Sequence, residues 1–313
     1  MKEYKWATLG CGVIANQLAQ AFAANGRKLY SVANRTHEKA VAFAEKYGID
    51  KVYDQIDDVF SDDEVDIIYI STPHNTHISY LRKALSAGKH VLCEKSITLN
   101  AEELEEAVRL AEEHHVVLAE AMTIFHMPIY KELRSRMDTG EFGELRLLQM
   151  NFGSYKEYDM KNRFFNRNLA GGALLDIGVY ALSFLRWFMS SKPDQILSQV
   201  KYAPTGVDEQ ASILLKNKEE EMATVILSLH AKQPKRGVVT GDKGYIEVYE
   251  YPRACKATIT NTATGEVETV EAGKTEDALK YEVEAMEAAI EGNLEDDCQI
   301  ITKDTMRILT SIK

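Results

Sequence analysis

The chain has 313 residues, of which 45% are hydrophobic, and its formal net charge at pH 7 is −11. This length provides a hydrophobic core for each of about two domains, which excludes a small scaffold held together by disulfides or metals. An acidic chain is repelled by phosphate polymers and by anionic membrane surfaces, so neither nucleic acid nor a membrane is an expected partner.

The cysteines and the apolar runs predict a cytoplasmic protein. The four cysteines are far apart and form no CxxC pair, which fits a reducing compartment and argues against a zinc site. No run reaches the roughly 18 consecutive apolar residues of a membrane span. Glu3 lies where a signal peptide would have its positively charged region, and Gly10, Gly12, Asn16 and Gln17 interrupt the apolar run, so a signal peptide is not expected. We also predict no metal site.

The first third of the chain alternates short apolar runs with stretches of helical spacing, a pattern typical of βαβ units and a parallel sheet. The predicted strands are 5–9, 29–33, 67–71, 90–93 and 116–119. The predicted helices between them are 13–25, 37–46, 76–87 and 101–115. Because this pattern stops near Ala121, we expect a first α/β domain over residues 1–121.

The remaining residues, 122–313, predict a second domain of different architecture. A helix is expected at 126–137, a strand at 144–152 and a longer helix at 174–189. Strand-like runs between 196 and 270 are separated by turn signals, which indicates a mostly antiparallel sheet with helices on one face. Two helices, 278–291 and 300–312, complete the prediction.

The segment between the first predicted strand and helix reads Gly-Cys-Gly-Val-Ile-Ala and predicts dinucleotide binding. Gly10 permits a tight turn, Gly12 lets the backbone approach a pyrophosphate, and Ala15 allows close packing of the helix on the strand. The helix N-terminus attracts the negative charge. The residues expected at the cofactor are Gly10, Gly12, Val13, Ile14 and Ala15. A glycine turn without a ligand, or a methyltransferase with another ligand, is the alternative.

The end of the second predicted strand favours NADP over NAD. An acid about 20 residues after the glycines would bind the ribose 2′-hydroxyl of NAD. The sequence has Asn34 and Arg35 there, and no acid. Arg35 can pair with a 2′-phosphate or stack on the adenine, and an exposed surface arginine is the alternative. We expect both residues to contact NADP, with NAD as the second option.

Two polar segments follow the predicted strands 67–71 and 90–93, at strand ends where open α/β sheets place ligands. The first reads Ser-Thr-Pro-His-Asn-Thr-His from Ser71, and the second reads Cys-Glu-Lys-Ser from Cys93. Lys95 is a candidate proton donor or electrostatic clamp, and a solvated pair of loop charges is the alternative. The residues expected to face the cofactor here are Thr72, Pro73, Asn75, His77, Glu94 and Lys95.

The segment from Gly171 to Tyr180 places an acid and a phenol on one side of a helix. Asp176 and Tyr180 are four residues apart, so they project from one face, one turn apart. The glycines give room for a close approach to the backbone. The alternative is an acid at the helix dipole and an aromatic core residue. Asn166, in the preceding loop, is a candidate for substrate contact.

In this order the motifs resemble the glucose–fructose oxidoreductase, inositol dehydrogenase and MocA (Gfo/Idh/MocA) family. The resemblance runs along the whole chain. It implies an N-terminal Rossmann domain with a doubly wound parallel sheet and a C-terminal α+β domain with an open sheet, with nicotinamide between them. The family's catalytic lysine falls on Lys95 and its acid on Asp176, while Ser96 replaces the family's usual proline. Tyr180 is similar to the residue of the dimeric dihydrodiol dehydrogenase branch, which favours NADP.

The resemblance implies hydride transfer between NADP and a secondary alcohol or carbonyl of a sugar, polyol or dihydrodiol. This transfer needs a proton donor or acceptor near the substrate oxygen, which either Lys95 or Tyr180 can supply. Asp176 would orient Lys95 or hold a substrate hydroxyl. The expected substrate contacts are Lys95, Asn166, Asp176 and Tyr180. The alternative is a regulatory protein of the same fold that senses nicotinamide dinucleotides without turnover.

The run 223–229 is almost continuously apolar or small, which predicts burial on both faces of its strand. Helices of one chain would cover only one face. We therefore expect a homodimer, or a dimer of dimers, that forms through the open sheet.

Overall fold

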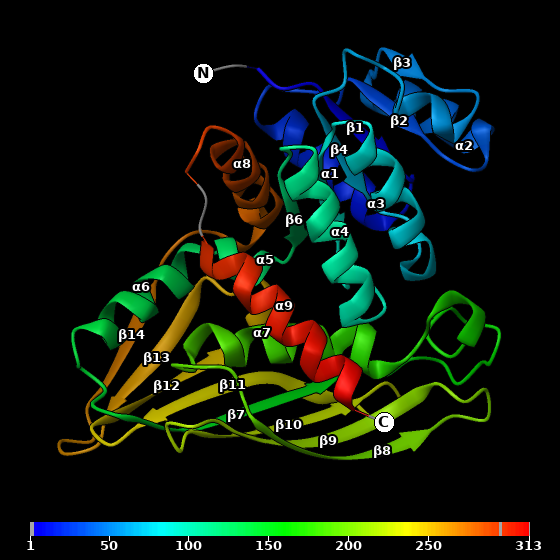
Figure 1. Cartoon of the computed structure of the whole chain (residues 1–313). Helices are drawn as coiled ribbons and strands as arrows, with labels where there is room; N and C mark the ends of the chain where they lie inside the picture. The colour runs from blue at the N-terminus through cyan, green and yellow to red at the C-terminus, as the bar shows by residue number, and fades with distance from the viewer. Residues whose placement is uncertain (1–2, 294–295, 313) are drawn as a thin grey trace. The chain divides into compact units, whose positions relative to one another are not determined.

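The computed structural model describes residues 3–293 and 296–312. The chain forms two compact units (Figure 1). The first unit comprises Met1–Ala121 and Leu279–Gln299, and the second comprises Met122–Ala278 and Ile300–Lys313.

The first unit contains a six-stranded sheet in the order β3-β2-β1-β4-β5-β6. Every pair of neighbouring strands is parallel. The strands are β1 (Trp6–Leu9), β2 (Ser31–Ala33), β3 (Lys51–Val52), β4 (Ile67–Ile70), β5 (His90–Glu94) and β6 (Leu118–Ala121). The strand order changes direction between β1 and β4, which is the point where doubly wound sheets bind ligands.

The helices of the first unit follow the predicted alternation with the strands. They are α1 (Val13–Ala24), α2 (His37–Tyr47), α3 (His77–Ser86) and α4 (Ala101–Glu113). The side chain of Asn100 accepts a hydrogen bond from the Glu103 amide at 2.8 Å, which satisfies one of the unpaired amides at the start of α4. The predicted α/β fold with a parallel sheet is therefore confirmed for this part of the chain.

Helix α8 (Ala278–Ile290) belongs largely to the first unit, whereas the sequence analysis assigned it to a second domain over residues 122–313. Glu287 accepts hydrogen bonds from the indole of Trp6 at 2.8 Å and from Arg27 at 2.6 Å. The residues of α8 in the core of this unit are Leu279, Val283 and Met286. An amphipathic pattern predicts that a helix has a buried face, but it does not indicate which core that face joins.

The second unit contains an eight-stranded sheet in the order β14-β13-β12-β11-β7-β10-β9-β8. The strands are β7 (Leu145–Gly153), β8 (Gln195–Tyr202), β9 (Asp208–Lys216), β10 (Met222–Ser228), β11 (Gln233–Gly241), β12 (Gly244–Tyr249), β13 (Lys256–Asn261) and β14 (Val267–Glu271). The pair β7 and β10 is parallel, and the other neighbouring pairs are antiparallel. This arrangement confirms the predicted mostly antiparallel sheet.

Helices cover one face of this sheet (Figure 1). They are α5 (Thr123–His126), α6 (Pro128–Asp138), α7 (Val179–Phe188) and the part of α9 (Asp296–Ser311) that begins at Ile300. The sequence predicted one helix over 126–137, whereas the structure has two helices, α5 and α6. They are separate because Met127 is extended and Pro128 begins α6. The segment Arg167–Phe188 is long and apolar enough to cross a membrane, but it contains the core helix α7, and 61% of its most apolar window is buried.

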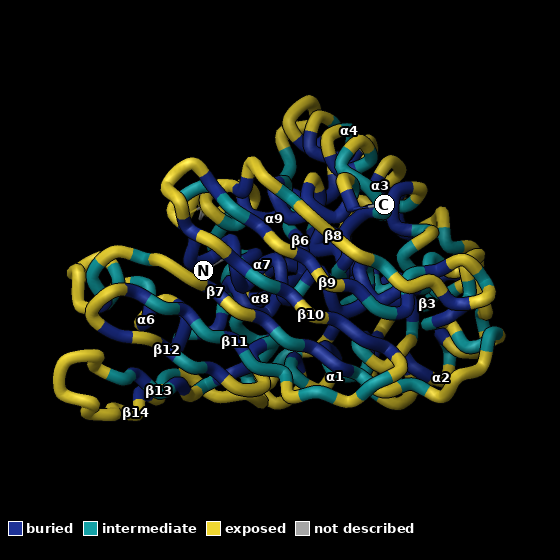
Figure 2. The backbone as a smooth tube through the Cα atoms, turned by 90° about the horizontal axis from the view of Figure 1, so that it is seen from below, coloured by how far each residue is buried: buried dark blue, intermediate teal, exposed yellow. Residues whose placement is uncertain are grey.

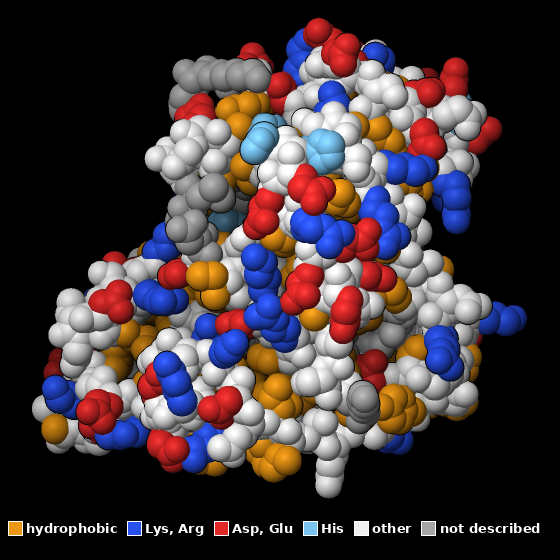
Figure 3. Space-filling model, viewed as in Figure 1, with side chains coloured by type: hydrophobic (Ala, Val, Ile, Leu, Met, Phe, Trp, Pro, Cys, Tyr) orange, Lys and Arg blue, Asp and Glu red, His pale blue; other side chains and the backbone are white. Residues whose placement is uncertain are grey.

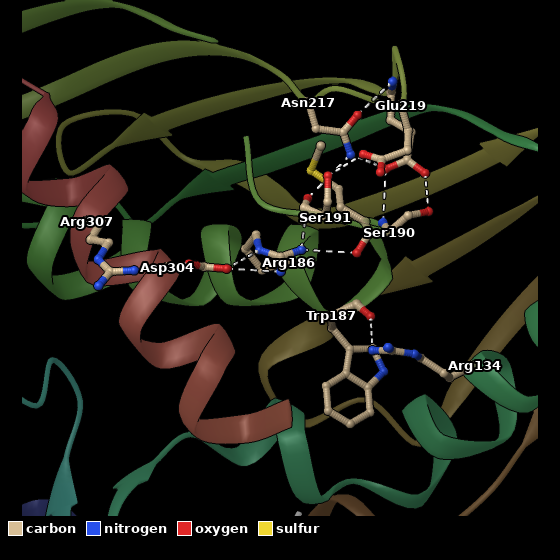
Figure 4. Close-up of polar contacts among 11 residues, drawn as sticks. Arg134, Arg186, Trp187, Ser190, Ser191, Asn217, Glu219, Asp304 and Arg307 are labelled. Atoms are coloured by element: carbon tan, nitrogen blue, oxygen red, sulfur yellow. Dashed lines mark hydrogen bonds and ion pairs between the residues drawn. The ribbon is translucent and has the colours of Figure 1, made fainter. Parts of the chain in front are cut away.

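A buried ion pair fixes α7 to α9 (Figure 4). The guanidinium of Arg186 donates to Asp304 Oδ2 at 3.1 and 3.2 Å. It also donates to the carbonyl oxygens of Met189 and Ser191 at 3.0 and 3.1 Å. A buried charge is tolerated only when it is paired and hydrogen-bonded, so these contacts specify how the two helices pack.

The other face of the sheet carries exposed apolar side chains, and Figure 2 shows exposed and buried residues alternating along its strands. On the side of the molecule seen in Figure 3, Lys and Arg side chains are mixed with those of Asp and Glu. Along β10, Ala223, Val225 and Leu227 are buried, whereas Met222 and Ile226 are 50% and 41% exposed. In the single chain the helices therefore cover one face of this strand, as expected, because alternate side chains point away from them. Burial of the second face by a partner stays a prediction. Further exposed apolar side chains on the sheet are Leu147, Leu197, Leu214, Tyr245, Tyr249 and Val267.

Candidate functional site

The turn between β1 and α1 has the backbone geometry of an anion site. Gly10 has φ +111°, and a Cβ atom there would lie 2.9 Å from Ser71 Oγ. At Gly12 a Cβ atom would meet no atom within 4 Å, so this position is open. Helix α1 has no side-chain hydrogen bond at its N-cap. Its first amides and the positive end of its dipole are therefore available to a phosphate group.

The loop after β2 presents positive charge and contains no acid. Arg35 is exposed, and the side-chain Nδ2 of Asn34 donates to the carbonyl oxygen of Thr36 at 2.9 Å. Lys39, in the first turn of α2, is a residue that the sequence analysis missed. Burial raises the pKa of the Cys11 thiol to about 11, and the charge of Lys39 acts in the opposite direction. The sequence signal for Lys39 is that it is a second cation near the end of the predicted second strand, four residues after Arg35.

The loops after β4 and β5 lie side by side at the carboxyl ends of these neighbouring strands. The hydroxyl of Thr76 bonds to Thr72 Oγ1 and to the carbonyl oxygen of Pro73, both at 2.7 Å, which shapes the first loop. His77 lies between the two loops and is fully buried. Its ring nitrogens lie 2.8 Å from the Thr72 carbonyl oxygen and 2.9 Å from that of Ser96. The ring is therefore enclosed by the backbone of the two loops, and its contact with a cofactor stays a prediction.

Lys95 immediately follows β5, where Glu94 and Glu120 lie on the neighbouring ends of β5 and β6. Glu94 is nearly buried and accepts a hydrogen bond from the phenol of Tyr69. The carboxylate of Glu120 accepts a hydrogen bond from the Ile97 amide at 3.1 Å. Glu94 is therefore part of the support beneath the Lys95 loop, and its contact with the cofactor stays a prediction.

The segment with Asp176 and Tyr180 begins as a π-helix over Leu174–Gly178 and continues as α7, where the sequence predicted one regular helix. π-Helical turns are rare and are often found at functional sites. Asp208 Oδ2 accepts a hydrogen bond from the Leu174 amide at 2.6 Å, at the start of this segment. The wider turn places Asp176 and Tyr180 differently from a regular helix.

The glycines before this segment make room for parts of the chain itself. Gly172 has φ +131°, and a Cβ atom there would lie 2.2 Å from Asp208 Oδ1. The Gly172 amide donates to the Phe164 carbonyl oxygen at 3.0 Å, and a Cβ on Gly171 would lie 2.6 Å from the same oxygen. The loop from Arg163 is consequently folded back onto the start of the helical segment.

This folded loop brings a cation to the predicted catalytic acid. Arg163 Nη2 lies 3.5 Å from Asp176 Oδ1, and Asp176 is 8% exposed. Arg163 and Lys156 both lie over the ring of Phe164, at 4.0 and 4.3 Å from its centroid. Asn166 Oδ1 accepts a hydrogen bond from the Asn168 amide at 2.9 Å, so that oxygen shapes the turn. The sequence pattern did not predict the contact between Arg163 and Asp176.

The predicted site residues are divided between the two units. Lys95 and the expected cofactor-binding residues are in the first unit, while Asn166, Asp176 and Tyr180 are in the second. Tyr180 is partly buried, and its ring centroid is 6.3 Å from that of Phe152. Across residues 3–293 and 296–312, no three side chains of His, Cys, Asp or Glu are grouped as in a metal site.

Comparison with known families identifies the class of protein. Residues 4–122 match the oxidoreductase family with an NAD-binding Rossmann fold, and residues 130–247 match the GFO/IDH/MocA C-terminal domain. The chain therefore belongs to the Gfo/Idh/MocA oxidoreductase family, as its motifs predicted. It is an NAD(P)-dependent oxidoreductase with a nucleotide-binding Rossmann domain.

Individual relatives agree with this assignment. The chain is 32% identical over 250 residues to the trans-1,2-dihydrobenzene-1,2-diol dehydrogenase of Mus musculus, which covers 78% of this chain and 74% of the mouse protein. The enzyme of the same name from Xenopus tropicalis is 30% identical over 248 residues, again 78% of this chain and 74% of the relative.

Solved structures share the fold at lower identity. A 3-ketoreductase from Actinomadura kijaniata, in complex with NADP and TDP-benzene, has a TM-score of 0.88 at 21% identity and covers 99% of this chain and 97% of its own. A UDP-N-acetylglucosamine 3-dehydrogenase from Acidithiobacillus ferrooxidans has a TM-score of 0.84 at 22% identity, with coverages of 100% and 97%. At these identities the likeness shows the fold alone.

The Asp208 carboxyl provides a pH-dependent test of the helix start. Burial raises its pKa from 3.8 to about 6, although backbone hydrogen bonds act against this effect. Between these values the folded protein holds a proton that the unfolded chain has released, so the contribution of Asp208 to stability falls as pH rises. In Asp208→Asn the uncharged amide oxygen can still accept from the Leu174 amide.

We expect Asp208→Asn to gain stability relative to the unmutated protein as pH rises from 4 to 7. The gain should reach at most about 3 kcal/mol, since one pKa unit corresponds to about 1.4 kcal/mol. Urea unfolding of both proteins at a series of pH values measures the difference. Asp159→Asn, at an exposed acid of the same unit, is the control. A difference that stays constant from pH 4 to pH 7 would contradict this role of Asp208.

Proposed function

We propose that the protein transfers a hydride between the nicotinamide of NADP and a secondary alcohol or carbonyl group of a sugar, polyol or dihydrodiol. The observation that carries this proposal is that Lys95, Asp176 and Tyr180 all occur in a family member with an intact glycine turn. The dihydrodiol dehydrogenases related to this chain support the class of substrate. The first unit would bind the cofactor and the second the substrate, with the boundary near Ala121.

The first unit fits a dinucleotide. Gly12 is open, Gly10 lets the turn pack directly on Ser71, and the start of α1 has no side-chain cap. The pyrophosphate would lie at Gly10, Gly12, Val13, Ile14 and Ala15. Asn34, Arg35 and Lys39 would hold the adenosine end with its 2′-phosphate, because two cations near the end of β2, with no acid in the loop between β2 and α2, favour the extra negative charge. Thr72, Pro73, Asn75 and Lys95 would face the remainder of the cofactor.

The chemistry of the reaction assigns a task to each polar side chain. The bound nicotinamide supplies or accepts the hydride, so the protein has to manage one proton at the substrate oxygen. The Lys95 ammonium or the Tyr180 phenol would give or take this proton. Asp176 would hold a neighbouring hydroxyl of the substrate or orient Lys95, and Arg163 would keep the Asp176 carboxylate in place through their contact at 3.5 Å.

The compartment is a further part of the proposal. Cys11, Cys93, Cys255 and Cys298 form no disulfide in the structure. Cysteines persist as thiols in a reducing compartment, which supports a location in the cytoplasm. The acidic net charge of −11 supports a small molecule rather than nucleic acid as the partner.

Replacement of the two proton-carrying groups tests the proposed chemistry. We expect Lys95→Met and Tyr180→Phe to reduce turnover by about 100-fold or more, because a general acid or base contributes roughly 10²- to 10⁴-fold. The affinity for NADPH should change little, because these groups act mainly on the reacting oxygen. Lys28→Met and Tyr202→Phe, at exposed positions, are matched controls.

The substrate for these assays comes from a screen of NADP reduction with pentoses, hexoses, inositols and dihydrodiols. Turnover only with phosphosugars, amino acids or simple hydroxy acids would show that the proposed substrate class is wrong. Binding of NADPH without oxidation by any of a broad panel of carbonyl compounds would favour a cofactor-sensing protein instead.

Cofactor preference is tested by fluorescence titration with NADPH and NADH. We expect NADPH to bind more tightly, and Arg35→Ala to remove most of the difference. A charge-assisted hydrogen bond is worth about 1.5–3 kcal/mol, which corresponds to roughly 10- to 100-fold in affinity. Lys39→Ala should have a smaller effect in the same direction, and Lys28→Ala should have none. Equal affinities for the two cofactors in the unmutated protein would refute the assignment.

We also propose a homodimer, or a dimer of dimers, that forms through the open face of the eight-stranded sheet. Two exposed apolar pairs lie directly opposite one another across strands, Leu147 with Met222 and Leu197 with Leu214. Exposed apolar surface of this kind is typical of protein interfaces. In sedimentation at micromolar concentration, Leu214→Lys should shift the protein toward monomer, and Thr264→Lys, in a turn, should not. A monomeric unmutated protein would overturn the proposal.

A further inference from the structure

Side chains, rather than a neighbouring strand, hold the backbone around Lys95. Strand β5 ends at Glu94, and the next residues leave the sheet. The amides of Lys95 and Ile97 donate to the carboxylates of Glu94 and Glu120, at 3.3 and 3.1 Å. Buried backbone groups need partners, and here ionisable side chains provide them.

Two histidines contact the carbonyl groups of the same loop. His74 Nε2 lies 3.0 Å from the Lys95 carbonyl oxygen, and His77 Nδ1 lies 2.9 Å from the Ser96 carbonyl oxygen. Ser96 has no exposed surface, so its carbonyl group depends on a protein partner. The two imidazole rings pack edge to face, with centroids 5.7 Å apart. Both carbonyl groups next to the Lys95 side chain are therefore contacted from α3 and the turn before it.

His77 also contacts the neighbouring loop. Its Nε2 atom lies 2.8 Å from the carbonyl oxygen of Thr72, which follows β4. Burial lowers the pKa of His77, and the charge of Lys95 acts in the same direction, against the effect of backbone hydrogen bonds to Thr72, Ser96 and Ile97. One ring thus bridges the two loops that were expected from the sequence to face the cofactor.

We propose that His77 is a positioning residue for Lys95: its neutral ring donates from Nδ1 to the Ser96 carbonyl group, packs against the Thr72 carbonyl group with Nε2, and so fixes the backbone that carries the lysine. This inference rests on the proposed catalytic role of Lys95. It gives His77 a different task from direct cofactor contact, because the ring is enclosed by the loops that it joins. A displaced loop would move the lysine side chain relative to the bound nicotinamide, and a shift of about 1 Å can cost about 100-fold in rate.

Two substitutions separate the contacts of the ring. In His77→Asn the amide lies near the Nδ1 position and can still reach Ser96, whereas in His77→Gln it lies near the Nε2 position and can still reach Thr72. Because Ser96 is bonded directly to Lys95, the Asn variant should retain more function than the Gln variant. His114→Asn, at an exposed histidine of the same unit, is the matched control.

Hydrogen exchange measured by mass spectrometry tests whether His77 holds the Lys95 loop, and it needs no substrate. In the full chain, peptides that cover residues 95–99 should exchange about tenfold faster in His77→Gln and less than that in His77→Asn. Peptides that cover β4 should not change in either variant. Unchanged exchange at 95–99, or equally faster exchange throughout the first unit, would overturn the proposal, since the latter indicates a general loss of stability.

Single-turnover kinetics then test the consequence for Lys95. At saturating NADPH and substrate, His77→Gln should slow hydride transfer by about 100-fold, while the Kd for NADPH stays within about twofold. An equal loss in the Asn and Gln variants, or a loss that appears only in the Kd, would contradict a positioning role. If the unmutated protein turns over no substrate, the proposed function fails, and the exchange experiment still decides whether His77 holds the loop.

Discussion

The close contact between the glycine turn and the end of β4 is the constraint on which the first unit depends. The Gly10 amide donates to the Ala33 carbonyl oxygen at 2.8 Å, and the Ser71 amide donates to the Leu9 carbonyl oxygen at 3.0 Å. The turn is thereby held between β2 and β4, where the order of strands changes direction. Any side chain at Gly10 would push the turn away from Ser71 and would move the start of α1.

In the second unit the corresponding close contact is made by a buried carboxyl group, that of Asp208. Asp208, at the beginning of β9, reaches the amide at the start of the segment that carries Asp176 and Tyr180. A side chain at Gly172 would occupy the position of the Asp208 oxygen. In both units a glycine permits a close approach, and a polar contact then fixes the element that bears the proposed functional groups.

The parts of the fold that depend on local pattern could be predicted from the sequence. The run Ile67–Ile70 is apolar throughout because β4 is buried on both faces, and this pattern indicated a parallel sheet. The glycine turn was also evident, because the residues that a pyrophosphate requires are adjacent in sequence. The same holds for the family, whose motifs lie in a fixed order.

Features that depend on contacts between distant residues could not be predicted. The packing of α8 with Trp6 joins residues that are 281 positions apart. The two-residue strand β3 is too short to give a pattern, and the π-helical turn at Asp176 resembles an ordinary helix in sequence. The place of His77 in a motif likewise does not reveal that its ring lies between the carbonyl groups of Thr72 and Ser96. Contacts between residues far apart in the sequence, such as that of Asp208 with the Leu174 amide, also have no local sequence signal.

The central claim is that the protein moves a hydride directly between carbon and nicotinamide. The most direct measurement mixes the protein with NADP and a substrate found in the screen, deuterated at the carbon that bears the reacting hydroxyl. Mass spectrometry of the recovered cofactor should show NADPH one mass unit heavier than that from the unlabelled substrate. Product formation without deuterium in the cofactor would contradict hydride transfer and with it the proposed function.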